Sequence, residues 1–191
     1  IDPVMDAVVA KVALPGLKGC EAITALENDK EVLVACGGSF ADADQAAGSG
    51  VAAIDIGVSP PAVTAIVKGP ALDGHAVNFS WVGALSPTRV LAATFGTFAD
   101  AKTNTPGTKD AVFSIDLVTG TGTSLGLEGE AFDFGRAAVS ATTLLVPDAS
   151  SVANTPRVHV YTVPATGDAT QTAVLDADPA KKLPPREIAW Y

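Results

Sequence analysis

The two cysteines of the chain, Cys20 and Cys36, are spaced so that they can meet across one hairpin. If the segments on either side of Asn28-Asp29-Lys30 are antiparallel strands, Cys36 lies opposite Ala22, and Cys20 is its diagonal neighbour on the same face. A disulfide is feasible there, and two unrelated buried thiols are the alternative. A bridge places a protein in the periplasm or outside the cell. Two cysteines and two distant histidines do not predict a zinc site.

Two loops of the same pattern offer carboxylates to a cation. The stretch at 38–44, Gly-Ser-Phe-Ala-Asp-Ala-Asp, returns at 96–102 as Gly-Thr-Phe-Ala-Asp-Ala-Lys. Ca²⁺ prefers such carboxylate oxygens together with loop carbonyls. No complete calcium-loop pattern is present, and the alternative is that the phenylalanines anchor the loops while the aspartates cap turns. The calcium candidates are Asp42, Asp44 and Asp100.

A second set of polar residues comes where the first strand of each repeat unit is expected to begin. A histidine among carboxylates and arginines suits binding, or proton transfer, on an anionic or lactone-like ligand. The alternative is that these groups bond only water and backbone, because no nucleophile and base can be paired from the sequence. The candidates are Glu21, Asp73, His75, Asn78, Asp133, Arg136, Arg186 and Glu187.

His159 alternates with Arg157 and Tyr161 along one predicted strand, whereas Val158 and Val160 point to the other face. This pattern predicts a solvated or cross-strand-paired histidine and not a ligand. The sequence has no haem-attachment motif, no metalloprotease motif, no nucleophile elbow, and no Walker or dinucleotide-binding loop.

Composition excludes several classes of protein. Of the 191 residues, 48% are hydrophobic, which is enough for a sizeable core. No apolar run approaches the roughly 20 residues that a membrane-spanning helix needs. The 21 acidic and 12 basic residues leave a net charge of −9, which repels nucleic acid and anionic lipid. We therefore expect neither a membrane span nor nucleic-acid binding.

The apolar runs form a degenerate repeat. Similar strands begin at residues 31, 89 and 143, so 58 and then 54 residues separate them. Each is preceded by a turn sequence, and each belongs to a set of four short runs bounded by Gly, Pro, Asn or Asp. Such periods are typical of a four-stranded unit used repeatedly, as in a β-propeller. A β-sandwich is the alternative, although it has no reason to repeat its turns at a near-constant offset.

Both ends of the chain fall inside a unit. Ile1-Asp2 matches the strand ends Ile54-Asp55-Ile56 and Ile115-Asp116-Leu117, which makes residues 7–13 an expected outer strand. Ile188-Ala189-Trp190-Tyr191 matches the inner strand around Phe79-Ser80-Trp81-Val82. We expect about three complete blades and two partial ones, at approximately 1–19, 20–72, 73–129, 130–180 and 181–191.

The order of an Ile-Asp ending, a short inner strand, a turn and a Val-Leu-Val-Ala strand resembles the YVTN-type β-propeller repeats of bacterial surface and periplasmic proteins. The Tyr-Val-Thr-Asn tetrapeptide that gives these repeats their name is represented here only by Leu33-Val34-Ala35-Cys36 and Leu91-Ala92-Ala93-Thr94. The Gly74-His75-Ala76-Val77 stretch resembles the histidine-containing start of an inner strand in lactonase-like propellers, which implies that His75 can meet substrate.

These observations favour a non-catalytic binding or assembly platform in a secreted, periplasmic or cell-surface protein. The missing blades are expected from another segment of the same precursor or from a separate chain, because an open ring leaves sheet surfaces uncovered. A symmetric dimer of half-rings is the alternative. The rim is expected to meet a protein or small-ligand partner. No cofactor is required, and Ca²⁺ is the cation that the acidity favours. The alternative is a lactonase-like or Ca²⁺-dependent hydrolase with its site in the central channel.

Overall fold

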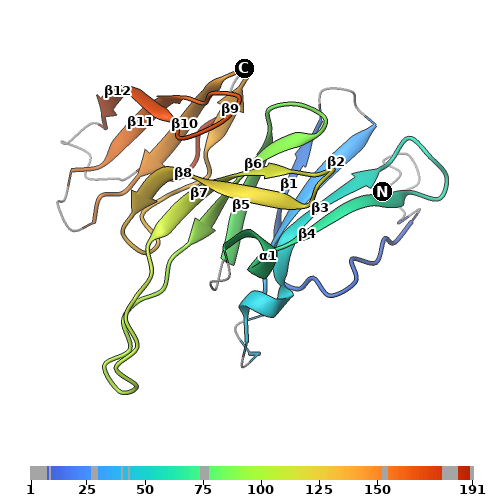
Figure 1. The fold of residues 1–191 in the computed structure, drawn as a ribbon, viewed down its shortest axis with the longest axis horizontal. Helices are drawn as coiled ribbons and strands as arrows, with labels where there is room; N and C mark the ends of the chain where they lie inside the picture. The colour runs from blue at the N-terminus through green and yellow to red at the C-terminus, as the bar shows by residue number, and fades with distance from the viewer. Residues whose placement is uncertain are drawn as a thin grey trace.

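In the described part of the chain, twelve strands pair into three antiparallel sheets (Figure 1). The computed structural model describes residues 8, 10–26, 30–39, 41–42, 44–73, 78–151, 155–177 and 185–189. Within each sheet the strands are neighbours in chain order, so every sheet is a simple meander. The first sheet consists of β1 (Cys20–Ala25), β2 (Glu31–Gly37), β3 (Ser49–Asp55) and β4 (Ala62–Lys68).

The other two sheets repeat this arrangement. The second sheet consists of β5 (Asn78–Ala84), β6 (Arg89–Phe95), β7 (Asp110–Asp116) and β8 (Thr121–Gly129). The third consists of β9 (Ala138–Ser140), β10 (Thr143–Asp148), β11 (Arg157–Thr162) and β12 (Thr170–Asp176). The 3₁₀ turn η1 (Ala46–Gly48) precedes β3, and α1 (Pro70–Asp73) connects the first sheet to the second.

Three sheets of four strands confirm the predicted all-β class and the arc of a β-propeller. The second sheet explains why the apolar runs are continuous and not alternating, because it is buried on both faces. Phe79, Val90 and Ile115 pack toward the first sheet, whereas Leu91 and Val112 pack toward the third. A sandwich of two sheets, the alternative considered from the sequence, has no such central layer.

The first strands of neighbouring units are in contact, because β5 contacts both β1 and β9. Thr24 of β1 donates its hydroxyl to the carbonyl of Val82 in β5, at 2.7 Å. At the third sheet, Arg136 forms a parallel bridge with Glu187. The backbone N–H of Arg136 donates to Arg186, at 2.8 Å, and Ile188 donates back to Arg136, at 3.1 Å. Residues 185–189 therefore run alongside the segment that leads into β9.

The segment before β1 covers the outer face of the first sheet. Val12, Leu14 and Leu17 pack against a group that includes Val34 and Ile54. The described residues of the expected outer strand at 7–13, namely 8 and 10–13, are not in a strand. Apolar side chains of an irregular segment thus cover this sheet face.

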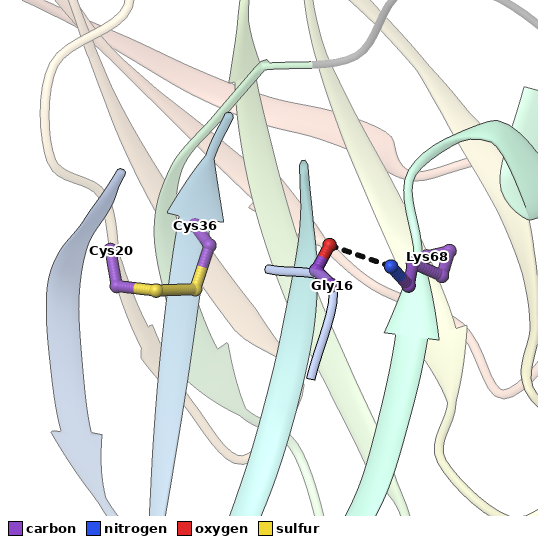
Figure 2. The surroundings of a disulfide bond; sticks show 4 residues. All are labelled: Gly16, Cys20, Cys36 and Lys68. Atoms are coloured by element: carbon purple, nitrogen blue, oxygen red, sulfur yellow. Dashed lines mark hydrogen bonds between the residues drawn. A yellow bond between two sulfur atoms is a disulfide. The ribbon is translucent and has the colours of Figure 1, made fainter. Parts of the chain in front are cut away.

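Lys68 at the end of β4 ties the covering segment to the sheet. Its Nζ donates a 2.6 Å hydrogen bond to the carbonyl of Gly16 (Figure 2). Gly16 has a φ of 72°, a conformation that glycine adopts without the steric cost that other residues meet. The turn at Gly16 is therefore linked to the opposite edge of the sheet from β1.

A disulfide joins Cys20 to Cys36 across β1 and β2 (Figure 2). The sequence predicted that Cys36 lies opposite Ala22, and this register was wrong because β1 contains a bulge. The register shifts between Cys20 and Ala22, so that Cys20 lies opposite Cys36 and Ala22 lies opposite Ala35. The bulge converts a diagonal pair into a direct one. No helix within the described ranges is both long and apolar enough to cross a membrane.

Candidate functional site

A small pocket, called here the rim pocket, opens where β1 and β5 begin and β2 and β6 end. Its volume is about 90 Å³. Strand ends bring the lining residues together, because antiparallel neighbours start and stop at the same edge of a sheet. The lining comprises Glu21, Gly37, Gly38, Gln45, Asn78, Phe79, Phe95 and Phe132.

Two phenylalanine rings of the lining, Phe95 and Phe132, stack on each other, and Phe98 extends the stack. The ring centroid of Phe132 lies 5.1 Å from that of Phe95 and 5.2 Å from that of Phe98. Both pairs are close to parallel, with angles of 29° and 28° between the rings. Phe98 is 73% exposed, so the outer end of the stack faces solvent. An exposed aromatic face attached to a packed one is a surface suited to contact with a ligand or partner.

The buried carboxylate of Asp110, at the start of β7, holds this stack in place. One oxygen accepts the backbone N–H groups of Gly96, at 2.6 Å, and Phe132, at 2.9 Å. The other accepts the N–H of Phe134, at 2.7 Å. Burial raises the pKa of Asp110, although the hydrogen bonds from Gly96, Phe134 and Phe132 act in the opposite direction. The carboxylate thereby joins the loop after β6 to the segment after β8.

Phe132 has a φ of 66°, which is an uncommon and costly conformation for a residue other than glycine. Such backbone persists only where the surroundings determine it. The hydrogen bond to Asp110 and the two ring contacts are those surroundings. The stack is therefore positioned by the fold before any ligand arrives, which lowers the entropic cost of binding.

The polar side chains of the rim pocket are two amides and one carboxylate. Gln45 uses its Nε2 to donate to the carbonyl of Gly37, at 3.1 Å, which leaves its Oε1 available. Asn78 is 5% exposed, and its Oδ1 has no hydrogen-bond partner within the described structure. Glu21 adds an exposed carboxylate. Among the described residues that line the pocket, none is basic.

A larger and more open pocket, called here the acidic pocket, lies between the second and third sheets. Its volume is about 270 Å³. Lys109, the one cationic residue among the described residues of its lining, pairs with Glu128 at 3.4 Å. Asp133 is buried and accepts both the backbone N–H and the hydroxyl of Ser151, at 2.9 and 3.0 Å. The lining comprises Lys109, Glu128, Gly129, Glu130, Asp133, Asp148 and Ser150.

Asp148 connects the acidic pocket to His159. Its Oδ2 lies 3.0 Å from Nε2 of His159, whose Nδ1 lies 3.2 Å from Oε1 of Gln171. Burial acts to raise the pKa of Asp148. The hydrogen bonds from His159 and Ser150, together with the nearby positive charges, have a larger effect in the opposite direction, so the pKa is lowered overall. Burial and the charge of Asp148 raise the pKa of Tyr161. His159 is paired across strands, as expected from its place in the pattern.

The structure distributes the predicted rim residues over three places. Glu21 and Asn78 line the rim pocket, and Asp133 lines the acidic pocket. Arg136 and Glu187 form an ion pair at 3.9 Å, and Arg186 donates to the carbonyl of Phe132 at 3.1 Å. His75 and the side chain of Asp73 lie outside the described residues.

The calcium candidates make local contacts. Asp42 pairs with Lys18, at 2.6 Å, and Asp44 caps the N–H of Ala47, at 3.2 Å. Asp100 accepts a backbone N–H and a hydroxyl in its own turn, and these bonds lower its pKa despite a small opposing effect of burial. Among the described residues, no group of three or more His, Cys, Asp or Glu is arranged to hold a metal. The calcium site stays a prediction.

Sequence reasoning missed the residues that build the rim pocket around Glu21 and Asn78. Asp110 directly precedes the apolar run Ala111-Val112-Phe113, and this position indicates a carboxylate at the edge of a buried strand. Nothing local indicates that its partners are Gly96 and Phe132. Gln45 carries no signal at all, because its role depends on where the loop returns to Gly37.

The fold defines a β-propeller arc with a stack of phenylalanine rings on its rim. No family model matches the chain, and no curated protein sequence is significantly similar to it. Among solved structures, the chain is similar to a crystal structure of a Bacteroides fragilis protein assigned as a 6-phosphogluconolactonase, with 11% sequence identity and a TM-score of 0.41. The match covers 81% of this chain but only 38% of that protein.

Proposed function

We propose that this chain is part of a larger β-propeller and works as a non-catalytic binding and assembly module. Its rim face contacts a small ligand or a protein, and further blades come from the same precursor or from a second chain. The YVTN-type repeat is the kind of propeller that the strand pattern favours.

The observation that carries the assembly role is the outward face of the third sheet. Leu144 and Val146 pack toward the second sheet. Because side chains alternate across a strand, Leu145 points to the other face. In the register of the sheet, Val160 lies opposite Leu145, and Leu175 lies opposite Val158. Leu175 is 55% exposed and the two valines are partly buried.

A further four-stranded sheet fits this apolar face. Within the chain, each pair of neighbouring sheets buries an apolar cluster of the same kind. The parallel bridge between Arg136 and Glu187 lies where the first strand of a following sheet would run, because the starting strands of neighbouring units lie side by side in this fold. The occupant that we infer is therefore another blade.

The disulfide supports an oxidising compartment, which is the periplasm, the cell surface or the outside of the cell. The preformed phenylalanine stack and the rim pocket support a binding role. The lactonase-like alternative draws its histidine from His75, outside the described residues, and its arginine from Arg136, which is paired with Glu187.

Sedimentation velocity over a concentration series tests the assembly role. We expect the wild-type chain to self-associate as its concentration rises, because an uncovered apolar sheet face seeks another surface. Val160→Lys should keep the chain monomeric. Val118→Lys is the matched control, because Val118 is 76% exposed in the turn between β7 and β8 and should not alter association. A wild-type chain that stays monomeric throughout the series, or equal association of all three proteins, would contradict the proposal.

A further inference from the structure

We propose that Cys20 is a modification site for small thiols, at which a compound of the glutathione class forms a mixed disulfide with the chain. The inference goes beyond the binding and assembly role and does not depend on it. It rests on the unequal burial of the two residues that share the disulfide. Cys36 is fully buried, whereas Cys20 is exposed.

The first argument is that solvent does not reach Cys36. This residue has an exposed fraction of 0%, and it belongs to the apolar cluster that Leu17 and Ile54 form on the outer face of the first sheet. A thiolate must reach the sulfur atom that it attacks. In the folded chain a thiol in solution therefore has no access to the sulfur of Cys36. Exchange at this bond is left to the sulfur of Cys20.

The second argument is the place of Cys20 at the margin of the sheet. Cys20 is the first residue of β1, and β1 is an edge strand, so no described strand of this sheet lies beyond it. The bridge crosses from β1 to β2 (Figure 2). In thiol–disulfide exchange the attacking, central and leaving sulfurs lie roughly in line. An attacker on Cys20 therefore approaches from the side that faces away from β2.

The reaction is a displacement at sulfur. The thiolate of the small thiol forms a bond to Sγ of Cys20, and the bond between the two Sγ atoms breaks. Cys36 leaves with the electron pair of that bond and takes a proton from water. Attack by Cys36 on the mixed disulfide reverses the step. Attack by a second small thiolate instead leaves two thiols on the chain, and the small thiol is oxidised to its own disulfide.

The third argument is that hydrogen bonds beside the bridge hold the two segments together while the bond is open. The N–H of Gly37 donates to the carbonyl of Gly19, at 2.8 Å, and the N–H of Gly38 donates to the carbonyl of Lys18, at 2.9 Å. These bonds keep Cys36 in its place when Cys20 carries the small thiol. The modification is therefore reversible within the folded chain.

Two single-cysteine variants test the assignment and are matched controls for each other, because both lack the bridge. Cys36→Ala keeps the thiol of Cys20, and Cys20→Ala keeps the thiol of Cys36. Each folded variant is incubated with oxidised glutathione, and intact-mass spectrometry follows the glutathionyl group that is added. The rates in denaturing urea correct for the intrinsic reactivity of each thiol.

We expect folded Cys36→Ala to react at least about a hundredfold faster than folded Cys20→Ala, since a buried thiol reacts only when the chain opens. Equal rates in the folded state, or faster reaction of Cys20→Ala, would overturn the proposal. Peptide mapping of the modified wild-type chain gives a second readout, and a glutathionyl group found on Cys36 would also overturn it.

Reduction of the intact bridge tests which sulfur is attacked. Dithiothreitol is the probe, because its second thiol carries the exchange to completion, and alkylation under denaturing conditions counts the freed thiols. Leu17→Ala thins the cover over Cys36 and alters no residue of β1. We expect this variant to change the rate of reduction by less than about threefold, because Cys20 is the sulfur attacked. A larger rise, or a wild-type bridge that dithiothreitol reduces only after urea unfolds the chain, would contradict the assignment.

Discussion

The carboxylate of Asp110 accepts a 2.9 Å hydrogen bond from the backbone N–H of Phe132, 22 residues further along the chain. This bond holds Phe132 at a φ of 66° and places its ring between those of Phe95 and Phe98. One buried carboxylate at the end of a strand thus determines the shape of a surface that is partly exposed to solvent.

Asp110→Asn should lower the free energy of unfolding by about 1–3 kcal/mol. The two carboxylate oxygens of Asp110 accept three N–H groups, whereas an amide has only one acceptor oxygen. The nitrogen of the new side chain would face a donor and leave it unpaired. Urea unfolding followed by tryptophan fluorescence measures the change. Asp168→Asn, at an exposed position, is the control and should change stability little. Equal stability of the two variants would show that Asp110 does not hold the rim together.

The contact between Asp148 and His159 predicts a dependence of stability on pH. Burial opposes ionisation of Asp148, but its hydrogen bonds and the nearby positive charges outweigh burial and lower the pKa in the folded state. A lowered carboxyl pKa contributes stability above the unfolded value of about 3.9, and this contribution is lost as the pH falls through that value toward the folded one. The stability gap between wild type and Asp148→Asn should therefore shrink as the pH falls below about 5, and it should keep shrinking below the unfolded value. Urea unfolding at several pH values measures this gap, and a gap that stays constant or widens on acidification would contradict the assignment.

The disulfide should contribute about 3 kcal/mol to the free energy of unfolding, because it closes a loop with a sequence separation of 16. The double variant Cys20→Ser with Cys36→Ala should lose this amount. A reducing agent should destabilise the wild-type chain to a similar extent and leave the double variant unchanged. Wild-type stability that is insensitive to complete reduction, verified by thiol titration, would show that the bridge does not constrain the fold.

Two turn positions predict effects of opposite sign. Ala141, between β9 and β10, is exposed and has a φ of 48°, so Ala141→Gly should stabilise the chain by about 0.5–1 kcal/mol as the strain is relieved. Gly120, between β7 and β8, has a φ of 69°, and a Cβ added there meets nothing within 4 Å. Gly120→Ala should therefore destabilise the chain by about 1 kcal/mol through backbone strain alone. Thermal unfolding of both variants measures the pair, and shifts of the same sign would refute the backbone explanation.

Much of the fold could be predicted from the sequence because strands and turns depend on local pattern. The runs Val32-Leu33-Val34-Ala35 and Val90-Leu91-Ala92-Ala93 are the second strands of their sheets, as their spacing predicts. Turn sequences such as Ser86-Pro87-Thr88 separate the first strand from the second, because Ser and Pro favour turns. The four-stranded order follows from these features repeated three times.

The candidate site could be predicted only in part. Glu21 was expected at the rim, and it lines the rim pocket. Asp133 was expected beside it, but it lines a different pocket, where it is bonded to Ser151. Residue type and position along a strand indicate which end of a sheet a side chain occupies. They do not indicate which neighbouring sheet it faces.

The sequence by itself therefore determined the strands, their order and the arc, since each depends on neighbours within a few residues and on a period that repeats. Only the tertiary structure decided the bulge that brings Cys20 opposite Cys36, the bonds of Asp110 to Gly96 and Phe132, and the residues that meet in the rim pocket. These contacts join segments distant in the chain, and they form only when the sheets pack in one register. That packing is a property of the whole fold and leaves no local mark in the sequence.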